Sequence, residues 1–368
     1  MPIPTRAAVV ESGGAPFTLT DVVLDDPGPH EAVVRMAAAG LCHTDLSVAS
    51  GALPFPLPGV LGHEGAGVVE AVGSAVTGVT PGDHVVLSFT SCGACRNCQG
   101  GHPAYCASWL PYNLLAGGRA DGTATIGRAG EPVGGHFFGQ SSFAERALVD
   151  ERSLVKVDPD VPLASIAPLG CGVQTGVGAV WHVLEPRAGG AVVVLGAGAV
   201  GLSAVMAAAL TPATTIVAVD RVGERLRLAL ELGATHTVDA GEEDLAAALA
   251  DVTGGQGADG VVETTGNVGV LRQGVDALGA RGTLVVVGAP PFGTEVCLDV
   301  NGLLGGKRIV GLTLGDSETQ AFIPALVRLV RDGRLPLHRL ISTYPFADIE
   351  QAVRDMKAGK AIKPVLTF

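Results

Sequence analysis

The sequence predicts an α/β protein with two parts, one built of short β-strands and the other a doubly wound parallel sheet. The chain has 368 residues, which exceeds the usual size of a single domain. Short β-like segments separated by glycine and proline fill roughly the first 170 residues, for example 31–38, 67–72 and 84–88. From Cys171 onward, apolar strands alternate with helical patterns, which is typical of a parallel sheet with crossover helices.

The second part supplies six strand-like runs. They are Ala191–Leu195, Thr215–Val219, His236–Val238, Gly260–Glu263, Gly282–Val287 and Arg308–Leu312. Helical patterns lie between them, including Val222–Leu232 and Glu242–Asp251. The tail returns to helices near Gln320–Arg331 and Ala347–Ala358 and closes with a strand at Pro364–Thr367.

The composition limits the class of protein. Hydrophobic residues make up 47 % of the chain and charged residues 16 %, so a large core is available and disorder is not expected. The net charge of −12 argues against nucleic acid or an anionic membrane as partner, because both attract basic surfaces. We expect neither a leader before Thr5–Val10 nor a membrane span in the glycine-interrupted stretch from Ala191, and therefore a cytoplasmic protein.

Four of the seven cysteines, Cys92, Cys95, Cys98 and Cys106, lie in a polar, glycine-rich excursion that begins at Thr90. Thiolates this close in sequence converge on one point, which suits a tetrahedral zinc site closed by four ligands. One alternative is two disulfides, which belong mainly to oxidising compartments. The other is an iron–sulfur cluster, whose cysteine runs often end in Cys-Pro, whereas an alanine follows Cys106. The spacing favours a structural zinc.

A dinucleotide signature follows the first strand of the second part. Gly196, Gly198, Val200 and Gly201 form Gly-x-Gly-x-Val-Gly at a strand-to-helix turn, where helix amides can face a pyrophosphate. Asp220 ends the next strand, nineteen residues after Gly201 (220 − 201). Its carboxylate would bond the adenine ribose hydroxyls and repel a 2′-phosphate, which favours NAD. Arg221 beside it weakens the preference over NADP, and an ordinary glycine-rich turn is the alternative interpretation.

Two more motifs and one isolated cysteine carry metal-binding residue types. Cys42 and His43 lie in Gly-Leu-Cys-His-Thr-Asp, His63 in Gly-His-Glu-x2-Gly-x5-Gly-x2-Val, and Cys171 in Leu-Gly-Cys-Gly. No spacing rule joins Cys42, His63 and Cys171, and a lone buried cysteine is usually a small hydrophobe. Together with the four-cysteine loop, the cofactor glycines and the closing Pro-Val-Leu-Thr-Phe, however, these motifs closely resemble the zinc-dependent medium-chain alcohol dehydrogenases over nearly the whole chain.

The resemblance implies a GroES-like β catalytic domain over 1–172 and 314–368, with a structural-zinc lobe at about 90–115. A Rossmann NAD-binding domain would occupy 173–313, with the active site in the cleft between the domains. Two zinc ions per chain are implied, one in the lobe and one for catalysis. The ligands of the catalytic zinc would be Cys42, His63 and Cys171, with Glu64 as an occasional alternative; Cys297 matches no ligand position.

The resemblance also implies reversible oxidation of a primary alcohol to the aldehyde, with hydride transfer to NAD. Zinc lowers the pKa of the alcohol, Thr44 takes the hydroxyl proton towards the cofactor ribose, and Asp45 orients His63. In many relatives the proton relay ends on a histidine where this chain has Ser47, which we expect to hand the proton to water. The cofactor contacts implied by position, each also consistent with an ordinary surface role, are His43, Lys363, Arg225, Val287 and Ala289.

An aromatic pocket is predicted although aromatic residues form only 4 % of the chain. The residues expected to line it are Phe89, Trp109, Leu110, Phe137, Phe138 and Thr313, the rings being core residues in the alternative interpretation. The runs Phe-Gly-Gln-Ser-Ser-Phe and Gly-Cys-Gly-Val-Gln-Thr-Gly look most like the aryl- and allylic-alcohol branch of the family, with benzyl-type alcohols as substrates.

Three other functions are weighed against this one. Glutathione-dependent formaldehyde dehydrogenases, or general aliphatic alcohol dehydrogenases, are the nearest; the former need a cation soon after the fourth lobe cysteine, where Leu110 stands and Arg119 lies farther on. A zinc hydrolase would need His-Glu-x-x-His, which Gly67 excludes. A non-catalytic NAD- and zinc-binding protein would not need an open zinc site. We expect a homodimer or homotetramer formed through the strands at 282–287 and 308–312.

Overall fold

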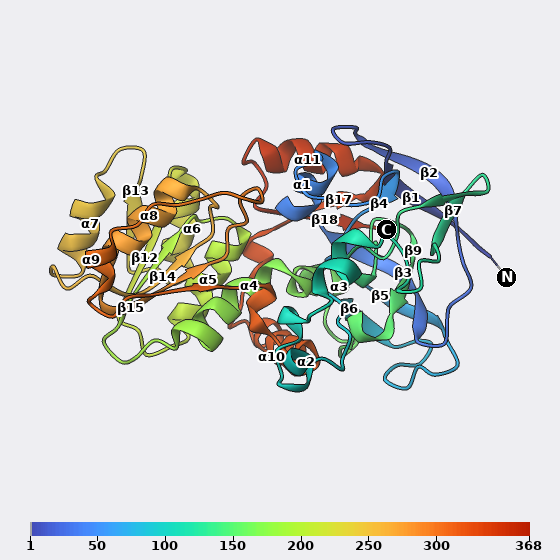
Figure 1. The fold of residues 1–368 in the computed structure, drawn as a ribbon, viewed down its shortest axis with the longest axis horizontal. Coiled ribbons are helices and arrows are strands. Elements are labelled where there is room, and N and C mark those ends of the chain that lie inside the picture. Colours follow the sequence, from blue (N-terminus) through green and yellow to red (C-terminus); the bar gives the residue numbers. More distant parts are fainter. Residues whose placement is uncertain (1) are drawn as a thin grey trace. The chain divides into compact units, whose positions relative to one another are not determined.

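Residues 2–368 are described by the structure, a computed structural model shown as a ribbon in Figure 1. The chain divides into two compact units. The first contains the residues up to Cys171 together with Glu318–Phe368, and the second contains Gly172–Ser317. Each unit has its own sheets and its own buried core.

The second unit is built on a six-stranded sheet in which every neighbouring pair is parallel, in the order β13-β12-β11-β14-β15-β16. The strands are β11 (Ala191–Leu195), β12 (Thr215–Asp220), β13 (His236–Asp239), β14 (Ala258–Glu263), β15 (Leu278–Val286) and β16 (Arg308–Gly311). The predicted doubly wound parallel sheet is confirmed. Its strand order reverses between β11 and β14, which is where such sheets bind ligands.

Apolar side chains fill the space between this sheet and its helices. The helices of the unit are α4 (Gly172–Gly178), which precedes the sheet, and five that connect its strands: α5 (Ala199–Ala209), α6 (Gly223–Glu231), α7 (Leu245–Val252), α8 (Val268–Ala277) and α9 (Val300–Leu303). One predicted boundary is corrected: the helix expected from Glu242 begins at Leu245. The reason is that the Asp244 side chain accepts a hydrogen bond from the Ala247 amide at 2.8 Å, which caps the helix there.

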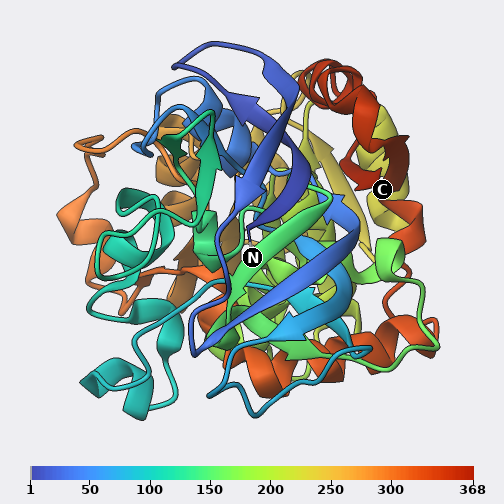
Figure 2. The same ribbon diagram turned by 90° about the vertical axis from the view of Figure 1, so that its right-hand side faces the viewer.

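The first unit contains two sheets, which Figure 2 shows with the N-terminal strands in blue and β9 in green. The five-stranded sheet is ordered β4-β1-β2-β7-β8, with β1 (Ile3–Val10), β2 (Phe17–Leu24), β4 (Gly59–Val60), β7 (Ile126–Arg128) and β8 (Glu131–Val133). The other sheet is ordered β10-β6-β5-β3-β18-β17, with β9 also paired to β3. Its strands are β3 (Glu31–Gly40), β5 (Gly65–Val72), β6 (His84–Leu87), β9 (Arg146–Asp150), β10 (Leu154–Lys156), β17 (Ile341–Pro345) and β18 (Lys363–Thr367).

The helices of the first unit lie at its strand ends and in its C-terminal segment. They are α1 (His43–Ala49), α2 (Arg96–Gln99), α3 (Leu163–Ile166), α10 (Thr319–Arg331) and α11 (Ile349–Lys357). The last strand, β18, pairs with the end of β3, and the Leu41 amide donates to the Pro364 carbonyl at 2.9 Å. The C-terminal segment therefore lies beside the loop that carries Cys42.

Within residues 2–368, no single helix has both the length and the apolar composition needed to cross a membrane. One bent pair of helices, Leu163–Gly170 followed by Gly172–Leu184, passes that test by length and composition alone. Both lie largely within buried parts of the chain.

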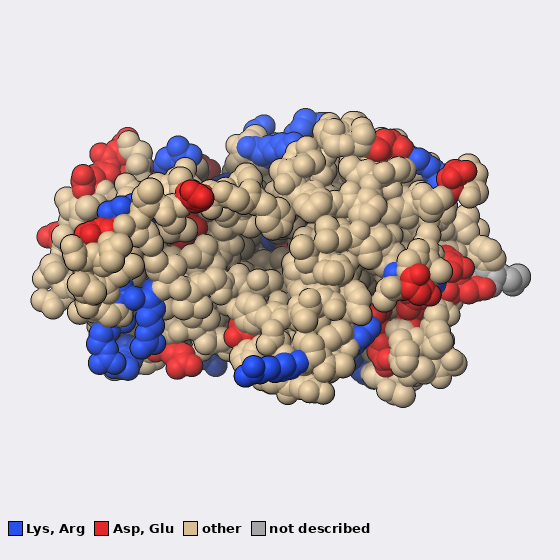
Figure 3. Space-filling model, viewed as in Figure 1, with Lys and Arg blue, Asp and Glu red and all other residues tan. Residues whose placement is uncertain are grey.

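On the face shown in Figure 3, basic and acidic side chains form separate small groups.

Candidate active site and metal centres

The first unit brings Cys42, His63, Glu64 and Cys171 together, with one ligand atom of each lying within 4.8 Å of all the others. Cys42 follows β3 and is the residue before α1, His63 and Glu64 directly precede β5, and Cys171 follows the short turn Ala167–Gly170. Three separate strand or turn ends therefore converge on one point. This convergence is a property of the fold, since nothing in the sequence spacing connects residues 42, 63 and 171.

His63 is held in one orientation by a buried carboxylate. Its Nδ1 lies 2.9 Å from Asp45 Oδ1, and that carboxylate also accepts hydrogen bonds from the amides of Gly62 (3.1 Å) and Cys42 (2.8 Å). The other ring nitrogen, Nε2, is buried and has no hydrogen-bond partner within residues 2–368. Two thiols and an imidazole whose free nitrogen is buried form the Cys₂His ligand set of a catalytic zinc, which the residues therefore fit.

The charges around this set favour the thiolate form of Cys42 but keep a proton on His63 and on Cys171. A hydrogen bond from Cys171 and the nearby charges of Lys363 and His63 lower the pKa of the Cys42 thiol well below its usual value, against the effect of burial. Burial lowers the pKa of His63, but the Asp45 carboxylate and Cys42 outweigh it and raise the pKa to about 10. Burial raises the pKa of Glu64 to about 7 even though Lys363 opposes it. A bound cation would replace the proton on this set.

Lys363, which the resemblance implies as a cofactor contact, forms a buried ion pair with Glu64. Its side chain is 2 % exposed, and its Nζ lies 2.9 and 3.0 Å from the two carboxylate oxygens of Glu64 and 3.2 Å from the Leu41 carbonyl. A cation held in this way neutralises the buried Glu64. Breaking a buried pair of this kind typically costs about 3–5 kcal/mol.

The predicted proton-transfer residues lie on or beside α1. Thr44 Oγ1 lies 3.9 Å from Cys42 Sγ, so the hydroxyl is next to the metal set. Ser47 lies one turn further along, and its carbonyl accepts a hydrogen bond from Ser50 Oγ at 3.0 Å. His43 is exposed and free to meet a ligand in solvent.

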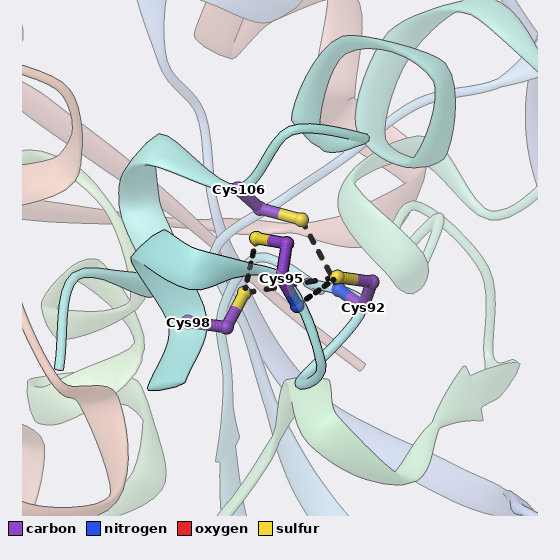
Figure 4. A group of neighbouring side chains, drawn as sticks. All are labelled: Cys92, Cys95, Cys98 and Cys106. Carbon is purple, nitrogen blue, oxygen red and sulfur yellow. Dashed lines mark hydrogen bonds between the residues drawn. The ribbon is translucent and has the colours of Figure 1, made fainter. Parts of the chain in front are cut away.

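The four lobe cysteines converge as the spacing predicts, and Figure 4 shows their sulfur atoms pointing towards one another around α2. Cys98 Sγ lies 3.9 Å from Cys92 Sγ and 3.5 Å from Cys95 Sγ. Four thiolates at zinc-bond length in a tetrahedron are about 3.8 Å apart. A hydrogen bond from the Ala107 amide contributes most to lowering the pKa of Cys95 to about 6. All seven cysteines lie in the described part of the chain, and none is in a disulfide.

The dinucleotide signature forms the turn between β11 and α5. Gly196 has a φ of +94°, which favours glycine, and a Cβ on Gly201 would lie 1.8 Å from the Gly196 carbonyl oxygen. A Cβ on Gly198 would meet nothing within 4 Å, so there is open space beside the residue that immediately precedes α5. An open helix N-terminus of this kind fits a pyrophosphate.

Asp220 ends β12 beside this turn. Its Oδ2 accepts a hydrogen bond from the Ala197 amide at 2.7 Å, and its Oδ1 accepts from the amides of Arg221 and Val222. The carboxylate is therefore fixed at the glycine turn, with lone pairs left for ribose hydroxyls. Arg225 Nη1 lies 4.0 Å from Asp220 Oδ2, and Arg225 Nε has no hydrogen-bond partner within residues 2–368.

A buried acid that was not predicted from the sequence fixes the backbone at the end of β14. Glu263 ends β14 with no exposed surface, and its carboxylate accepts hydrogen bonds from Thr265 and Gly266. Its backbone carbonyl accepts from the Val287 amide at 2.9 Å. Val287 is partly buried and Ala289 is exposed, so both stay accessible to a ligand on this edge. The only sequence signal for Glu263 was its place at the end of an apolar strand.

The predicted pocket rings of the first unit gather around His63. Phe138 stacks on the His63 ring with centroids 4.6 Å apart, and Phe137 meets it edge-on at 5.4 Å. Trp109 lies edge-on to Phe138 at 5.5 Å. Phe55, which the sequence interpretation did not select, packs edge-on against Phe137 at 5.1 Å. These rings form an apolar wall behind the metal set.

The remaining predicted pocket residues are less closely tied to this wall. Phe89 is 3 % exposed, Leu110 is partly buried, and Thr313 belongs to the second unit.

Arg119, which was weighed as a carboxylate-binding cation, is already bound to two acidic side chains of this protein. Its Nε lies 3.0 Å from both Glu31 carboxylate oxygens and its Nη1 lies 2.7 Å from Asp25. This arrangement leaves it bound to the protein's own acids.

A doubly wound sheet with a dinucleotide turn, a Cys₂His set with one free position and a four-cysteine lobe together define a metal-dependent dehydrogenase. Two family models match the chain: the alcohol dehydrogenase GroES-like domain at residues 28–159 and the zinc-binding dehydrogenase at 199–330. The chain belongs to the zinc-dependent medium-chain alcohol dehydrogenase family. It is a zinc enzyme that uses a nicotinamide cofactor on alcohols, which confirms the predicted fold and family.

Individual relatives span the whole chain. Geraniol dehydrogenase of Castellaniella defragrans is 43 % identical over 100 % of this chain and 98 % of its own. The crystal structure of an alcohol dehydrogenase zinc-binding domain protein from Burkholderia ambifaria is 50 % identical with a TM-score of 0.97, covering 100 % of both chains. Benzyl alcohol dehydrogenase from Acinetobacter calcoaceticus is 44 % identical with a TM-score of 0.96, covering 99 % of both.

Proposed function

We propose that this protein oxidises aryl or allylic primary alcohols, such as benzyl-type alcohols, to aldehydes with NAD, and that it holds two zinc ions per chain. The observation that carries the proposal is the Cys42, His63 and Cys171 set, in which a buried, partnerless His63 Nε2 faces two thiols. The aromatic wall of Phe137 and Phe138 against His63 supports an apolar, flat substrate. Geraniol and benzyl alcohol are the substrates named for two relatives.

The chain's own residues divide the work. Cys42, His63 and Cys171 would hold a zinc ion that, when bound, would lower the pKa of an alcohol hydroxyl, and a bound nicotinamide would supply the hydride acceptor. Thr44, beside Cys42, receives the hydroxyl proton and Ser47 hands it to water. Asp45 keeps the proton of His63 on Nδ1, so that Nε2 is free to bind metal. The rings behind His63 exclude water from the reacting atoms.

In this proposal, residues 1–172 and 314–368 form the catalytic domain and 173–313 the NAD domain. The cofactor would be held by Gly196, Gly198, Val200, Gly201 and Asp220, with His43, Arg225, Val287, Ala289 and Lys363 as further contacts. The lobe zinc would be held by Cys92, Cys95, Cys98 and Cys106, four thiolates that leave no open position. The lobe is therefore structural, and the chemistry belongs to Cys42, His63 and Cys171.

A substrate and metal survey tests this proposal directly. Initial rates with benzyl, cinnamyl and geranyl alcohol are expected to exceed those with ethanol, because apolar contact area contributes to transition-state binding. Metal analysis of the purified protein is expected to give two zinc ions per chain. Equal rates for ethanol and the larger alcohols would overturn the substrate class, and a single zinc would leave only the lobe occupied.

Asp220→Asn is expected to shift cofactor discrimination towards NADP by about tenfold or more, because the carboxylate that repels a 2′-phosphate is lost. Asparagine has one side-chain oxygen, so it can keep the hydrogen bonds from the Arg221 and Val222 amides but loses the one from Ala197, which goes to the other carboxylate oxygen; thermal unfolding checks that the turn is retained. Titration of NADH and NADPH fluorescence measures both affinities. Asp239→Asn is the matched control, since Asp239 is the register partner of Asp220 at the end of β13. An unchanged NADH-to-NADPH affinity ratio in Asp220→Asn would remove Asp220 from the cofactor site.

A glutathione-dependent formaldehyde activity is disfavoured because Arg119 already forms ion pairs with Glu31 and Asp25.

We further propose that the protein forms a homodimer or homotetramer that associates through the edge strand β16. The support is that the segment connecting β15 to β16 carries exposed apolar residues, Phe292 (71 %), Val300 (72 %) and Leu304 (79 %), which one copy would cover on another. Light scattering distinguishes dimer from tetramer. A cytoplasmic location stays a prediction.

A further inference from the structure

Gln140, a residue with no part in the chemistry above, lies buried beside the metal set with 1 % of its surface exposed. Its Oε1 accepts a hydrogen bond from the Gly65 amide at 3.0 Å, and its Nε2 donates to the carbonyls of His63 (3.0 Å) and Ser88 (2.9 Å). A single side-chain amide therefore binds the backbone on both sides of Glu64.

The position of the Gln140 amide explains why a side chain is needed to bond the backbone on both sides of Glu64. In a β-strand, the carbonyl before a residue and the amide after it point to the same side. On the other side, the Glu64 carbonyl accepts from the Gly40 amide at 2.9 Å. The ladder between β5 and β6 ends at Ala66 opposite Val86, so Ser88 has no direct backbone register with Glu64. Gln140 fills the gap where these two strands separate.

The hydrogen bonds continue from Ser88 to the third metal ligand. Ser88 is fully buried, and its Oγ donates to the Gly170 carbonyl at 2.7 Å. Gly170 immediately precedes Cys171. The amide relay, defined here as Gln140 and Ser88, thus connects the backbone at His63 to the backbone at Cys171.

The segment that carries Gln140 is held in an unfavourable conformation. His136, Phe138 and Ser141 all have positive φ, at +54°, +53° and +54°. The turn is fixed to the strand before His63, because Ser141 Oγ donates to the Val60 carbonyl at 2.7 Å and the Ser142 amide donates to the Gly62 carbonyl at 2.9 Å. Such strained residues persist where the surrounding structure imposes them, and they cluster at functional sites.

We propose that the amide relay sets the separation of His63 and Cys171 and thereby determines how firmly the catalytic zinc is retained. Gln140 and Ser88 are positioning residues, because neither offers a ligand atom to the metal set. The proposal rests on the assignment of Cys42, His63 and Cys171 as zinc ligands. Removing a residue that orients a metal ligand typically weakens metal binding about 10- to 100-fold.

Gln140→Met keeps the size of the side chain and removes all three hydrogen bonds. Zinc release from the purified, zinc-loaded protein is followed with a colorimetric chelator. Iodoacetamide labelling, mapped by mass spectrometry, shows which cysteines become exposed. We expect one zinc per chain to leave about 10- to 100-fold faster than in the wild type, with labelling at Cys42 and Cys171 but not at the lobe cysteines. Ser88→Ala, which removes one hydrogen bond, is expected to have a smaller effect in the same direction.

The matched control is Asn113→Leu. Asn113 is another fully buried amide with three backbone hydrogen bonds, to Thr90 (3.0 Å twice) and Trp109 (2.8 Å), on the lobe side of the unit. It is expected to leave labelling of Cys42 and Cys171 at the wild-type rate. If Asn113→Leu exposed those thiols as readily as Gln140→Met, general loosening would explain the effect and the relay would be wrong.

The outcomes are separable from those of the proposed function. A wild type with only one zinc would contradict the metal site itself. A wild type with two zincs and unchanged release from Gln140→Met and Ser88→Ala would overturn the relay alone. If Gln140→Met does not fold, as judged by thermal unfolding, Ser88→Ala decides the question. A double-mutant comparison adds a second criterion, because two members of one relay should have non-additive effects on the release rate.

Discussion

Cys42→Ser is expected to reduce kcat for alcohol oxidation to below about 1 % of the wild-type value, a larger loss than the 10- to 100-fold typical of residues that only support a ligand. Serine cannot replace a thiolate as a soft zinc ligand, and Cys42 is the thiol whose pKa its neighbours hold lowest in this set. The affinity for NADH is expected to change by less than about twofold, because the dinucleotide turn and Asp220 belong to the other unit.

Steady-state kinetics with benzyl alcohol and fluorescence titration with NADH measure the two effects separately. Cys297→Ser serves as the control, since Cys297 is exposed and offers no atom to either metal set. It should match the wild type in both measurements. Substantial turnover by a folded Cys42→Ser protein would contradict the assignment of the catalytic metal.

Cys98→Ser is expected to release the lobe zinc and to lower Tm by at least about 5 °C. The loop from Gly93 to His102 is mainly exposed, and no residue of helix α2 is buried, so little apolar packing would hold it without metal. Binding of a structural zinc by four thiolates contributes about 10–16 kcal/mol to the folding of small domains, which is large against the stability of an ordinary protein.

Zinc analysis and thermal unfolding test this second prediction together. One zinc per chain should remain, and Cys42 and Cys171 should stay protected from alkylation. Loss of activity should follow loss of fold or assembly and not precede it during heating. A Cys98→Ser protein that kept both zinc ions and the wild-type Tm would show that the lobe is not the structural site.

The fold was largely predictable from local patterns. Apolar runs bounded by turn residues located the six parallel strands, most clearly β11, β12 and β14, because a strand buried on both faces reads as a continuous apolar segment. The four lobe cysteines were predictable for the same reason, since their ligand atoms are brought together by a single short loop. Helix starts were less certain: the acidic run Glu242-Glu243-Asp244 does not show by itself that Asp244 is the cap.

The active site was predictable only through the resemblance. Cys42, His63 and Cys171 meet because three strand ends of the first unit converge, and that convergence depends on pairings between distant segments. Lys363 shows how this limits the interpretation of single residues. Its charge was evident from the sequence, but its partner, Glu64, lies 299 residues away and is reached only after β18 pairs with β3. Gln140 lies in the Phe-Gly-Gln-Ser-Ser-Phe run that supports the resemblance, but its contacts were not predictable because a buried amide and a surface amide look alike in a sequence.

The distance along the chain between Glu64 and Lys363 also fixes the order of events during synthesis. The last metal ligand, Cys171, is made 192 residues before Lys363 (363 − 171), which at about 5–20 residues per second corresponds to about 10–40 s on the ribosome. Throughout this interval the Glu64 carboxylate lacks its counter-ion, and β3 lacks the strand that covers the Cys42 loop. A chain terminated before β18 would therefore lack both the counter-ion of Glu64 and the strand that pairs with the end of β3 beside Cys42.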